Sequence, residues 1–297
     1  ANSVFEIHAN SLEGFEGETN LNAAWTLGGG KTGVASILFI PTNEAAPDEP
    51  KEYSFGGSFS YKDPSNGLTV TVNLNPITLT VNPTPLLELT YFMQRDIIGD
   101  DPLTTEVEPM QAAEFALVIN NKGNGNADNV RITTQQPQII ENNSGLLIEM
   151  KIDSSQVNGQ KASLFLGESH VNDFGSIAAH EQAYGQWWLS STLLGHFIEY
   201  SVTATHVTSY GNPNLSLLDT VTIHELVHGF TVNTEGDMPL RGFLVNDVAD
   251  TEDMPDQVYF TDATQKAVSM AAELTPMRQS NTEWHLTVTA GTEGWNY

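Results

Sequence analysis

One pentapeptide carries residues that could do chemistry, His224-Glu225-Leu226-Val227-His228. On a helix, His224 and His228 would lie one turn apart on the same face, where their imidazole nitrogens could bind one zinc ion. Glu225 would then act as general base on a zinc-bound water, which is the chemistry of a zinc metallopeptidase. A third zinc ligand would have to come from one of three acidic residues further along the chain: Glu235, Glu252 or Asp253.

The residues on either side of this pentapeptide favour a strand instead of a helix. β-Branched and aromatic residues fill 220–223 and 230–232, and such residues prefer extended backbone. In a strand, His224 and His228 would share one face but lie about 13 Å apart, too far for a single ion. We therefore predict a structural strand over 220–232, with no catalytic residue and no zinc. The zinc metallopeptidase is the alternative.

Two acidic clusters have the chemistry to bind a different metal ion. Asp96, Asp100 and Asp101 lie near one another in the sequence with Glu106 and Glu108, and calcium prefers carboxylate oxygens. The spacing of a full EF-hand loop is absent, so we expect a solvated acidic loop. Calcium held by Asp96, Asp100 and Asp101 is the alternative. The same expectation applies to the second cluster: Asp247, Asp250, Glu252, Asp253 and Asp256.

Adjacent tryptophans, Trp187 and Trp188, are the candidate residues for ligand binding. Aromatic rings offer a flat apolar surface on which a sugar can stack. In a strand, neighbouring side chains point to opposite faces, so at most one of the two rings can be exposed on a given side. We expect one tryptophan in the core and the other at an interface between modules, with glycan contact as the alternative.

The charge balance narrows the classes of partner. The 297 residues include 37 acidic and 11 basic side chains, a formal net charge of −26. A surface of this sign repels phosphate backbones and anionic lipids, because binding them requires clustered Lys and Arg. The absence of cysteine excludes disulfides, thiol nucleophiles and cysteine-bound zinc. No stretch reaches about 18 consecutive apolar residues, so we expect no membrane insertion. Because of the negative charge, we also expect no nucleic-acid binding.

The elements that must position these residues are predicted to be short strands. Threonine-rich alternation, clearest at 68–74, with frequent turn residues is typical of a β-sandwich. Pro83 and Pro85 stiffen the chain and remove two backbone donors, which indicates a linker. We predict an all-β protein of tandem immunoglobulin-like β-sandwich modules. The modules cover 1–83, 86–232 and 233–297, the last a short β module or the start of a further one.

A local pattern in the middle module resembles a known family. An apolar strand ends in Asn-x-x-Gly at 120–123, and Ala-x-Asn-Val at 127–130 opens the next strand. With segments 177–182 and 194–197, this pattern resembles the CARDB and NEW3 type of bacterial immunoglobulin-like module. Further segments resemble repeats in very large, uncharacterised secreted or cell-surface proteins of the Bacteroides group: 91–96, 99–101, 186–189 and 204–210.

This likeness runs from about residue 20 to the end of the chain. It implies a fold and a location at the bacterial cell surface or outside the cell, but no activity. We therefore expect a non-enzymatic structural, adhesion or spacer region of a larger secreted protein. Its partners would be other domains of the same polypeptide and a glycan or protein ligand. We expect no cofactor; calcium belongs to the acidic-loop alternative and zinc to the metallopeptidase alternative.

Overall fold

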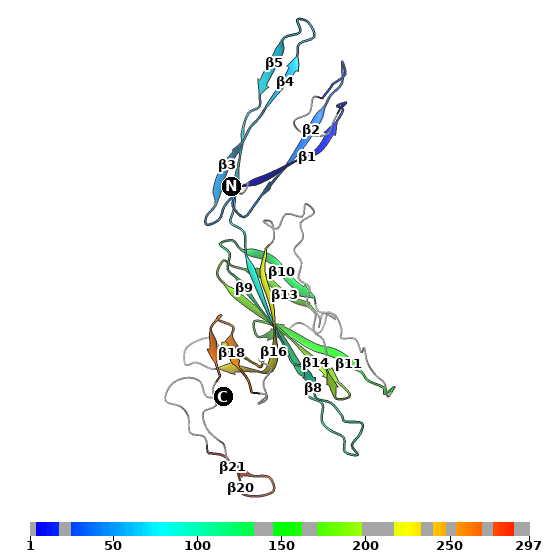
Figure 1. Ribbon diagram of the computed structural model, residues 1–297, viewed down its shortest axis with the longest axis vertical. Coiled ribbons are helices and arrows are strands. Elements are labelled where there is room, and N and C mark those ends of the chain that lie inside the picture. The colour runs from blue at the N-terminus through cyan, green and yellow to red at the C-terminus, as the bar shows by residue number, and fades with distance from the viewer. Residues whose placement is uncertain are drawn as a thin grey trace.

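The computed structural model describes residues 4–17, 25–133, 145–161, 171–197, 217–232, 240–247, 254–268 and 276–287. Every regular element in these ranges is a β-strand, which confirms the predicted all-β fold class. None of the ranges holds a helix with the length and apolarity that a membrane crossing requires. Figure 1 shows the first six strands standing beyond one end of a larger body that contains the central sheet.

The N-terminal unit consists of antiparallel strand pairs. β1 pairs with β2, β3 with β6 and β4 with β5, so the chain from β3 to β6 forms one long hairpin. Aromatic rings join this hairpin to the first one, since the Phe5 ring centroid lies 4.7 Å from that of Tyr53 and 5.0 Å from that of Phe55. The strands are β1 (Phe5–Glu13), β2 (Val34–Pro41), β3 (Lys51–Phe55), β4 (Ser58–Lys62), β5 (Thr69–Asn73) and β6 (Ile77–Val81).

A nine-stranded central sheet has the order β12-β11-β14-β9-β7-β16-β17-β18-β19. β16 changes partner along its 15 residues: its first half pairs parallel with β7, and its second half pairs antiparallel with β17. One strand therefore belongs to both halves of the sheet. The bounds are β7 (Leu87–Met93), β9 (Ala113–Asn121), β11 (Met150–Val157), β12 (Gln160–Lys161), β14 (Gln182–Ser191), β16 (Leu218–Val232), β17 (Leu240–Val245), β18 (Gln257–Phe260) and β19 (Gln265–Ala267).

One face of the central sheet is covered by β10 (Ala127–Thr133) and β13 (Val171–Ile177), which pair with each other. The main core between the two layers contains alternate residues of β7, β9 and β14 together with Ala127, Phe174 and Ile177. β9 is almost continuously buried, because its remaining residues reach a second core on the other side of the sheet. Two packed layers of strands make the fold β-sandwich-like.

The last strands of the central sheet, β17, β18 and β19, pack partly against the opposite face of β7 and β9. Phe92 and Val118 from the central strands form the second core there, together with Leu226, Phe243 and Val245. The sheet shows no break at residue 232, where a separate C-terminal module is predicted, since β16 pairs directly with β17. β17, β18 and β19 are short, and strands of this length bury too little apolar surface to be stable apart from the rest of the sheet. The remaining strand pairs are β8 (Asp96–Ile97) with β15 (Gly195–His196), and β20 (Met277–Arg278) with β21 (Trp284–His285).

Asn121, the last residue of β9, lies at the junction between the N-terminal unit and the sandwich. Its side chain is fully buried. Its Oδ1 accepts hydrogen bonds from the backbone amides of Leu86 and Gly123, at 3.2 and 3.1 Å. Its two Nδ2 hydrogens are shared among three carbonyl oxygens, those of Gly125, Ile177 and Ala178. A single amide thus satisfies backbone groups from the linker, from the loop after β9 and from the turn after β13.

Two glycines let the loop after β9 approach the linker closely. A Cβ at Gly125 would stand 2.0 Å from the carbonyl oxygen of Pro83, and one at Gly123 would stand 2.4 Å from the Leu86 nitrogen. Between them, Asn124 Nδ2 donates to the carbonyl oxygen of Pro47 in the N-terminal unit, at 2.9 Å. The junction is therefore closed by backbone contacts that leave no room for a side chain.

Candidate functional site

The pentapeptide 224–228 lies within β16, so the strand predicted over 220–232 is confirmed. A register shift between Leu226 and His228 inserts an extra residue into β16 relative to β17. Beyond this bulge Gly229 faces the second core, whereas His228 lies opposite Leu244 and is exposed. The expectation that His224 and His228 share a face is therefore wrong. The bulge turns them to opposite faces, with about 13 Å of extended chain between them.

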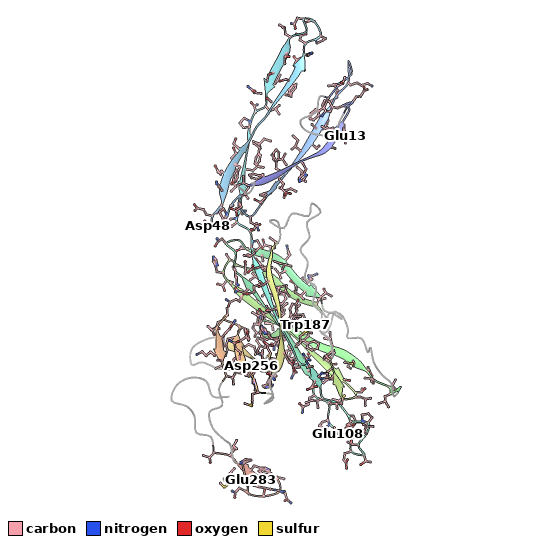
Figure 2. All side chains as sticks on the ribbon, in the orientation of Figure 1. Glu13, Asp48, Glu108, Trp187, Asp256 and Glu283 are labelled. Atoms are coloured by element: carbon pink, nitrogen blue, oxygen red, sulfur yellow. The ribbon has the colours of Figure 1, made fainter. Side chains whose placement is uncertain are left out.

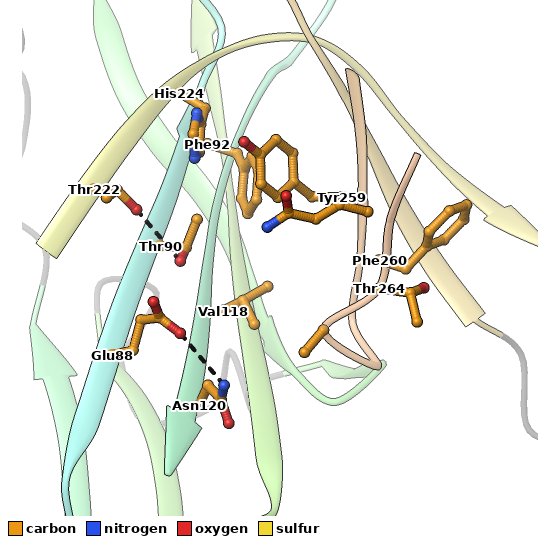
Figure 3. Close-up of a pocket in the computed structure, with 12 residues that line it drawn as sticks. Glu88, Thr90, Phe92, Val118, Asn120, Thr222, His224, Tyr259, Phe260 and Thr264 are labelled. Carbon is orange, nitrogen blue, oxygen red and sulfur yellow. Dashed lines mark hydrogen bonds between the residues drawn. The ribbon is translucent and has the colours of Figure 1, made fainter. Parts of the chain in front are cut away.

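His224 faces the second core and is held by its neighbours. Its Nδ1 forms a hydrogen bond with Asp247 Oδ2. Its ring centroid lies 5.5 Å from that of Phe92 and 4.4 Å from that of Tyr259. The imidazole is thus fixed between a carboxylate and two aromatic rings, at the edge of a cleft (Figure 3).

Glu225 is directed into a different set of contacts. Its carboxylate pairs with Arg95 at 2.9 Å, and its backbone amide donates to Asp247 Oδ1 at 2.9 Å. Among the described residues, no three His, Asp or Glu side chains are placed to hold one metal ion. The acidic residues considered as a third zinc ligand lie outside the described ranges: Glu235, Glu252 and Asp253.

Zinc content separates the metallopeptidase from the structural strand. Because β16 holds His224 and His228 apart, the purified protein is expected to retain well under one zinc ion per chain after dialysis against zinc-containing buffer. His224→Ala should leave that value unchanged, as should the matched variant His196→Ala. Inductively coupled plasma mass spectrometry measures the content. One zinc ion per chain that is lost in His224→Ala alone would establish a zinc site at His224 and overturn the structural strand.

The cleft lies between strands β7, β9 and β16 of the central sheet and the β18–β19 hairpin at the end of the same sheet. It has a volume of about 220 Å³. Its floor consists of side chains from three neighbouring strands, β7, β9 and β16, and its other wall comes from β18 and the turn that follows. Figure 3 shows Phe92, His224 and Tyr259 at one end of the cleft and Glu88 and Asn120 at the other. The lining residues are Glu88, Thr90, Phe92, Val118, Asn120, Thr222, His224, Tyr259, Phe260, Ala263, Thr264 and Gln265.

Glu88 supplies the negative charge at the polar end of the cleft. Burial alone would raise the pKa of its carboxyl, but an ion pair with Lys122 at 3.0 Å and a hydrogen bond from Asn120 lower the pKa below its usual value. The carboxylate is therefore charged at neutral pH and acts only as an acceptor. At the other end, burial and the nearby Asp247 raise the pKa of Tyr259, so its hydroxyl stays protonated.

The acidic loop at 96–108 uses its carboxylates for its own contacts. Asp96 Oδ1 lies 2.6 Å from His196 Nδ1, and Asp100 Oδ1 accepts the backbone amide of Glu108 at 2.9 Å. Glu108 in turn accepts the backbone amide of Asp101 at 3.0 Å, which holds the pKa of Glu108 below its usual value. The Asp101 carboxylate accepts the backbone amide of Leu103 at 2.9 Å, so the three aspartate carboxylates bond to different groups. In the second cluster, Asp256 accepts the amide of Asp247, and three residues lie outside the described ranges: Asp250, Glu252 and Asp253.

The two tryptophans lie on opposite faces of β14. Trp187 is 2% exposed and belongs to the main core, where it cannot meet a ligand. Trp188 is half-buried on the other face. Figure 2 places Trp187 inside the densely packed body of the protein. The prediction that the two tryptophan side chains point to opposite faces is confirmed. The aromatic wall of the cleft comes from other residues, chiefly His224 and Tyr259.

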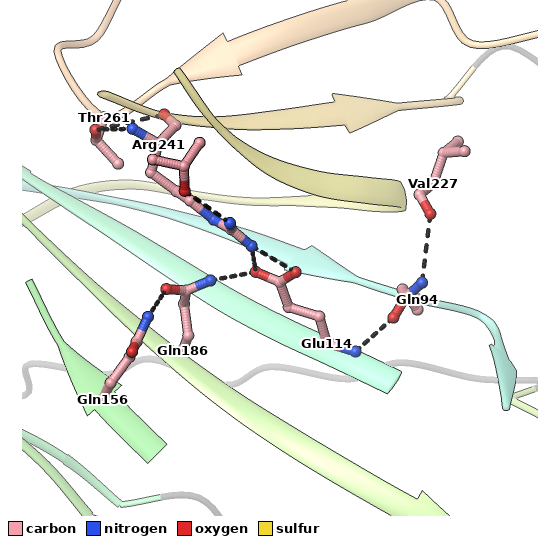
Figure 4. A network of polar contacts seen from close by, with 8 residues as sticks. Gln94, Glu114, Gln156, Gln186, Val227, Arg241 and Thr261 are labelled. Atoms are coloured by element: carbon pink, nitrogen blue, oxygen red, sulfur yellow. Dashed lines mark hydrogen bonds and ion pairs between the residues drawn. The ribbon is translucent and has the colours of Figure 1, made fainter. Parts of the chain in front are cut away.

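A buried ion pair attaches the C-terminal half of the sheet beside the cleft (Figure 4). Arg241 Nη2 on β17 lies 2.7 and 2.8 Å from the two carboxylate oxygens of Glu114 on β9. The Arg241 and Glu114 side chains are only 17% and 10% exposed. Gln186 also donates to Glu114. Gly229 makes room for the pair, since a Cβ there would stand 2.4 Å from a Glu114 oxygen.

Alternation along two strands is the sequence signal that could have indicated the cleft. Glu88 and Thr90 alternate with apolar residues in β7, and they pair with Thr220 and Thr222 of β16. That pairing is parallel and joins segments more than a hundred residues apart, so the sequence alone does not bring them together. Comparisons of the chain with protein-family models, with curated proteins and with solved structures find no match.

Proposed function

We propose that the chain is a non-enzymatic spacer and adhesion region of a larger bacterial protein, secreted or held at the cell surface, and built from tandem immunoglobulin-like β-sandwich modules. The observation that carries the proposal is the closed junction around Asn121. It lies within the 120–123 segment that resembles the CARDB and NEW3 type of module. A spacer must hold one end of the molecule at a fixed place relative to the other, and a junction sealed by backbone contacts does so.

The linker supports this role by its composition. Pro83 and Pro85 restrict the backbone between β6 and β7, and proline-containing linkers act as semi-rigid spacers. Gly125 N donates to the carbonyl oxygen of Thr84 at 3.2 Å, and Lys122 N donates to that of Leu86 at 2.8 Å. The linker is thus paired with the sandwich over several residues. The partners in this proposal are other domains of the same polypeptide and an extracellular glycan or protein.

The extended path of β16 weighs against the metallopeptidase as a second function. Peptidase chemistry at H-E-x-x-H requires both histidines on one side of a helix, and β16 turns His224 and His228 apart. No cofactor is part of the proposal. Calcium at the acidic loop stays an alternative that a chelator would test.

A distance measurement tests the spacer. The chain has no cysteine, so spin labels can be placed at Lys62→Cys in β4 and Lys161→Cys in β12, both exposed positions. Double electron–electron resonance is expected to give one narrow distance distribution, as narrow as that of a control pair within the sandwich, Glu149→Cys with Lys161→Cys. A broad distribution for the first pair alone would reject a rigid spacer.

A glycine variant checks that the junction causes the rigidity. Gly125→Ala places a methyl group against the carbonyl of Pro83 and should broaden the Lys62–Lys161 distribution. Gly29→Ala is the matched control, because a Cβ at Gly29 meets no atom within 4 Å. An unchanged distribution in Gly125→Ala would show that the contacts at the junction do not set the geometry.

A further inference from the structure

We propose that the cleft between strands β7, β9 and β16 and the β18–β19 hairpin binds the ring of a neutral sugar. This inference names the ligand class for the adhesion role and so rests on the proposed function. The cleft differs from the tryptophan pair indicated by the sequence, since Trp187 is buried in the main core.

The size of the cleft suits a small ring. Pockets for drug-sized ligands occupy roughly 300–1,000 Å³, and this cleft is smaller, about 220 Å³. Its floor is built from the faces of β7, β9 and β16, whose backbone groups are already paired within the central sheet. An extended peptide could therefore not add a strand here, because that mode requires an unpaired edge.

The side chains of the cleft match the two surfaces of a pyranose. Tyr259 and His224 form a half-buried aromatic wall backed by Phe92, against which the C–H face of a sugar can stack. Away from this wall, Thr90 and Thr222 present hydroxyls that lie 3.4 Å apart. A hydroxyl both donates and accepts, as the hydroxyl groups of a sugar do.

The polar end of the cleft offers complementary groups. Glu88 supplies carboxylate oxygens that accept hydrogen bonds, and Asn120 supplies an amide that donates and accepts. On the opposite wall, Thr264 and Gln265 add a hydroxyl and a second amide. The cleft can therefore bond several adjacent hydroxyls of one ring at once.

Charge selects a neutral sugar over an acidic one. None of the described residues lining the cleft is Lys or Arg. Lys122 pairs with Glu88 at 3.0 Å but also with Asp219 at 3.8 Å, so two carboxylates surround its single positive charge. The Glu88 carboxylate lies at one end, and the Asp247 carboxylate lies behind His224 at the other. Sialic, uronic or sulfated sugars would bring a further negative charge between these groups, where like charges repel.

Saturation-transfer difference NMR on the full chain tests the proposal, with glucose, galactose, mannose and N-acetylglucosamine as neutral probes and glucuronate and N-acetylneuraminate as acidic probes. At least one neutral sugar should show transfer with millimolar affinity. Tyr259→Ala should weaken that binding about tenfold, since it removes the stacking surface. Tyr61→Ala is the control: Tyr61 is 47% exposed on β4 of the N-terminal unit and does not line the cleft, so its removal should leave the affinity unchanged.

A second variant guards against loss of folding in Tyr259→Ala. Thr90→Val keeps the shape of the side chain, removes one cleft hydroxyl and should weaken binding several-fold with an unchanged near-ultraviolet circular dichroism spectrum. No transfer to any neutral sugar, equal binding in both cleft variants and wild type, or stronger binding of the acidic probes would overturn the assignment. The spin-label distances do not depend on a sugar, so a narrow distribution with no sugar binding would remove the ligand and leave the spacer.

Discussion

Asn121→Leu is expected to destabilise the sandwich by about 3–5 kcal/mol, because it leaves several buried backbone groups without partners. The variant orphans the amides of Leu86 and Gly123 and removes a donor from the carbonyls of Gly125, Ile177 and Ala178, of which Ala178 keeps the amide of Glu181. Each unpaired buried group costs about 1–3 kcal/mol, although the costs are not additive. Urea unfolding followed by tryptophan fluorescence measures the change, since Trp187 lies in the same main core.

The neighbouring asparagine provides a matched control. Asn120 points to the other face of β9, is half-buried and donates one long hydrogen bond of 3.4 Å to Glu88. Asn120→Leu should therefore cost less than about 1 kcal/mol. Similar losses for the two variants would mean that the hydrogen bonds of Asn121 do not hold the junction.

Arg241→Met is the second substitution with a large expected effect. It removes the guanidinium from a nearly enclosed ion pair and leaves the Glu114 carboxylate buried without its counter-charge. Breaking one partner of such a pair costs about 3–5 kcal/mol. Because Arg241 lies on β17, we expect β17, β18 and β19 to lose protection first, which amide hydrogen exchange read by mass spectrometry would resolve.

A double-mutant cycle separates lost attraction from an uncompensated charge. Arg241→Met combined with Glu114→Gln removes both charges, and it should be less destabilising than Arg241→Met alone. Glu114→Gln keeps a side-chain amide oxygen that can still accept the hydrogen bond from Gln186. A double variant that is as unstable as the sum of the two single variants would show that the pair contributes no coupling energy.

Local patterns in the sequence are sufficient for the strands but not for their partners. The alternation at 68–74 matches β5, and the β-branched flanks of 224–228 match β16, because both depend on residues adjacent in the chain. The parallel pairing of β7 with β16 depends on residues far apart in the sequence. For the same reason, the sequence divides the chain at residue 232, whereas the second core joins Phe92 to Phe243 across that position.

The cleft and the orientation of the two histidines also depend on contacts between residues far apart in the sequence. Phe92, His224 and Tyr259 come from three strands, and nothing in their separate segments indicates that their rings meet. The bulge between Leu226 and His228 has one sequence signal, the glycine at 229, since a glycine within a strand often accompanies a bulge or a close approach. Here Gly229 makes room for Glu114 and Arg241, a reason that only the folded partner strands reveal.

The change of partner along β16 affects how the protein would respond to a stretching force. If such a spacer is stretched, force first reaches the C-terminal strands β17, β18 and β19, which follow β16 in the chain and pair antiparallel with their neighbours. Once these have opened, force acts between the start of β7 and the far end of β16, and these strands run in the same direction over Leu218–Glu225. The pull would then slide one strand along the other, so all the hydrogen bonds of that ladder would have to yield together. The N-terminal hairpins face a different geometry, because β3 and β6 are antiparallel and can open one bond at a time. Under load, the antiparallel hairpins on both sides would extend while the parallel β7–β16 ladder kept its shape.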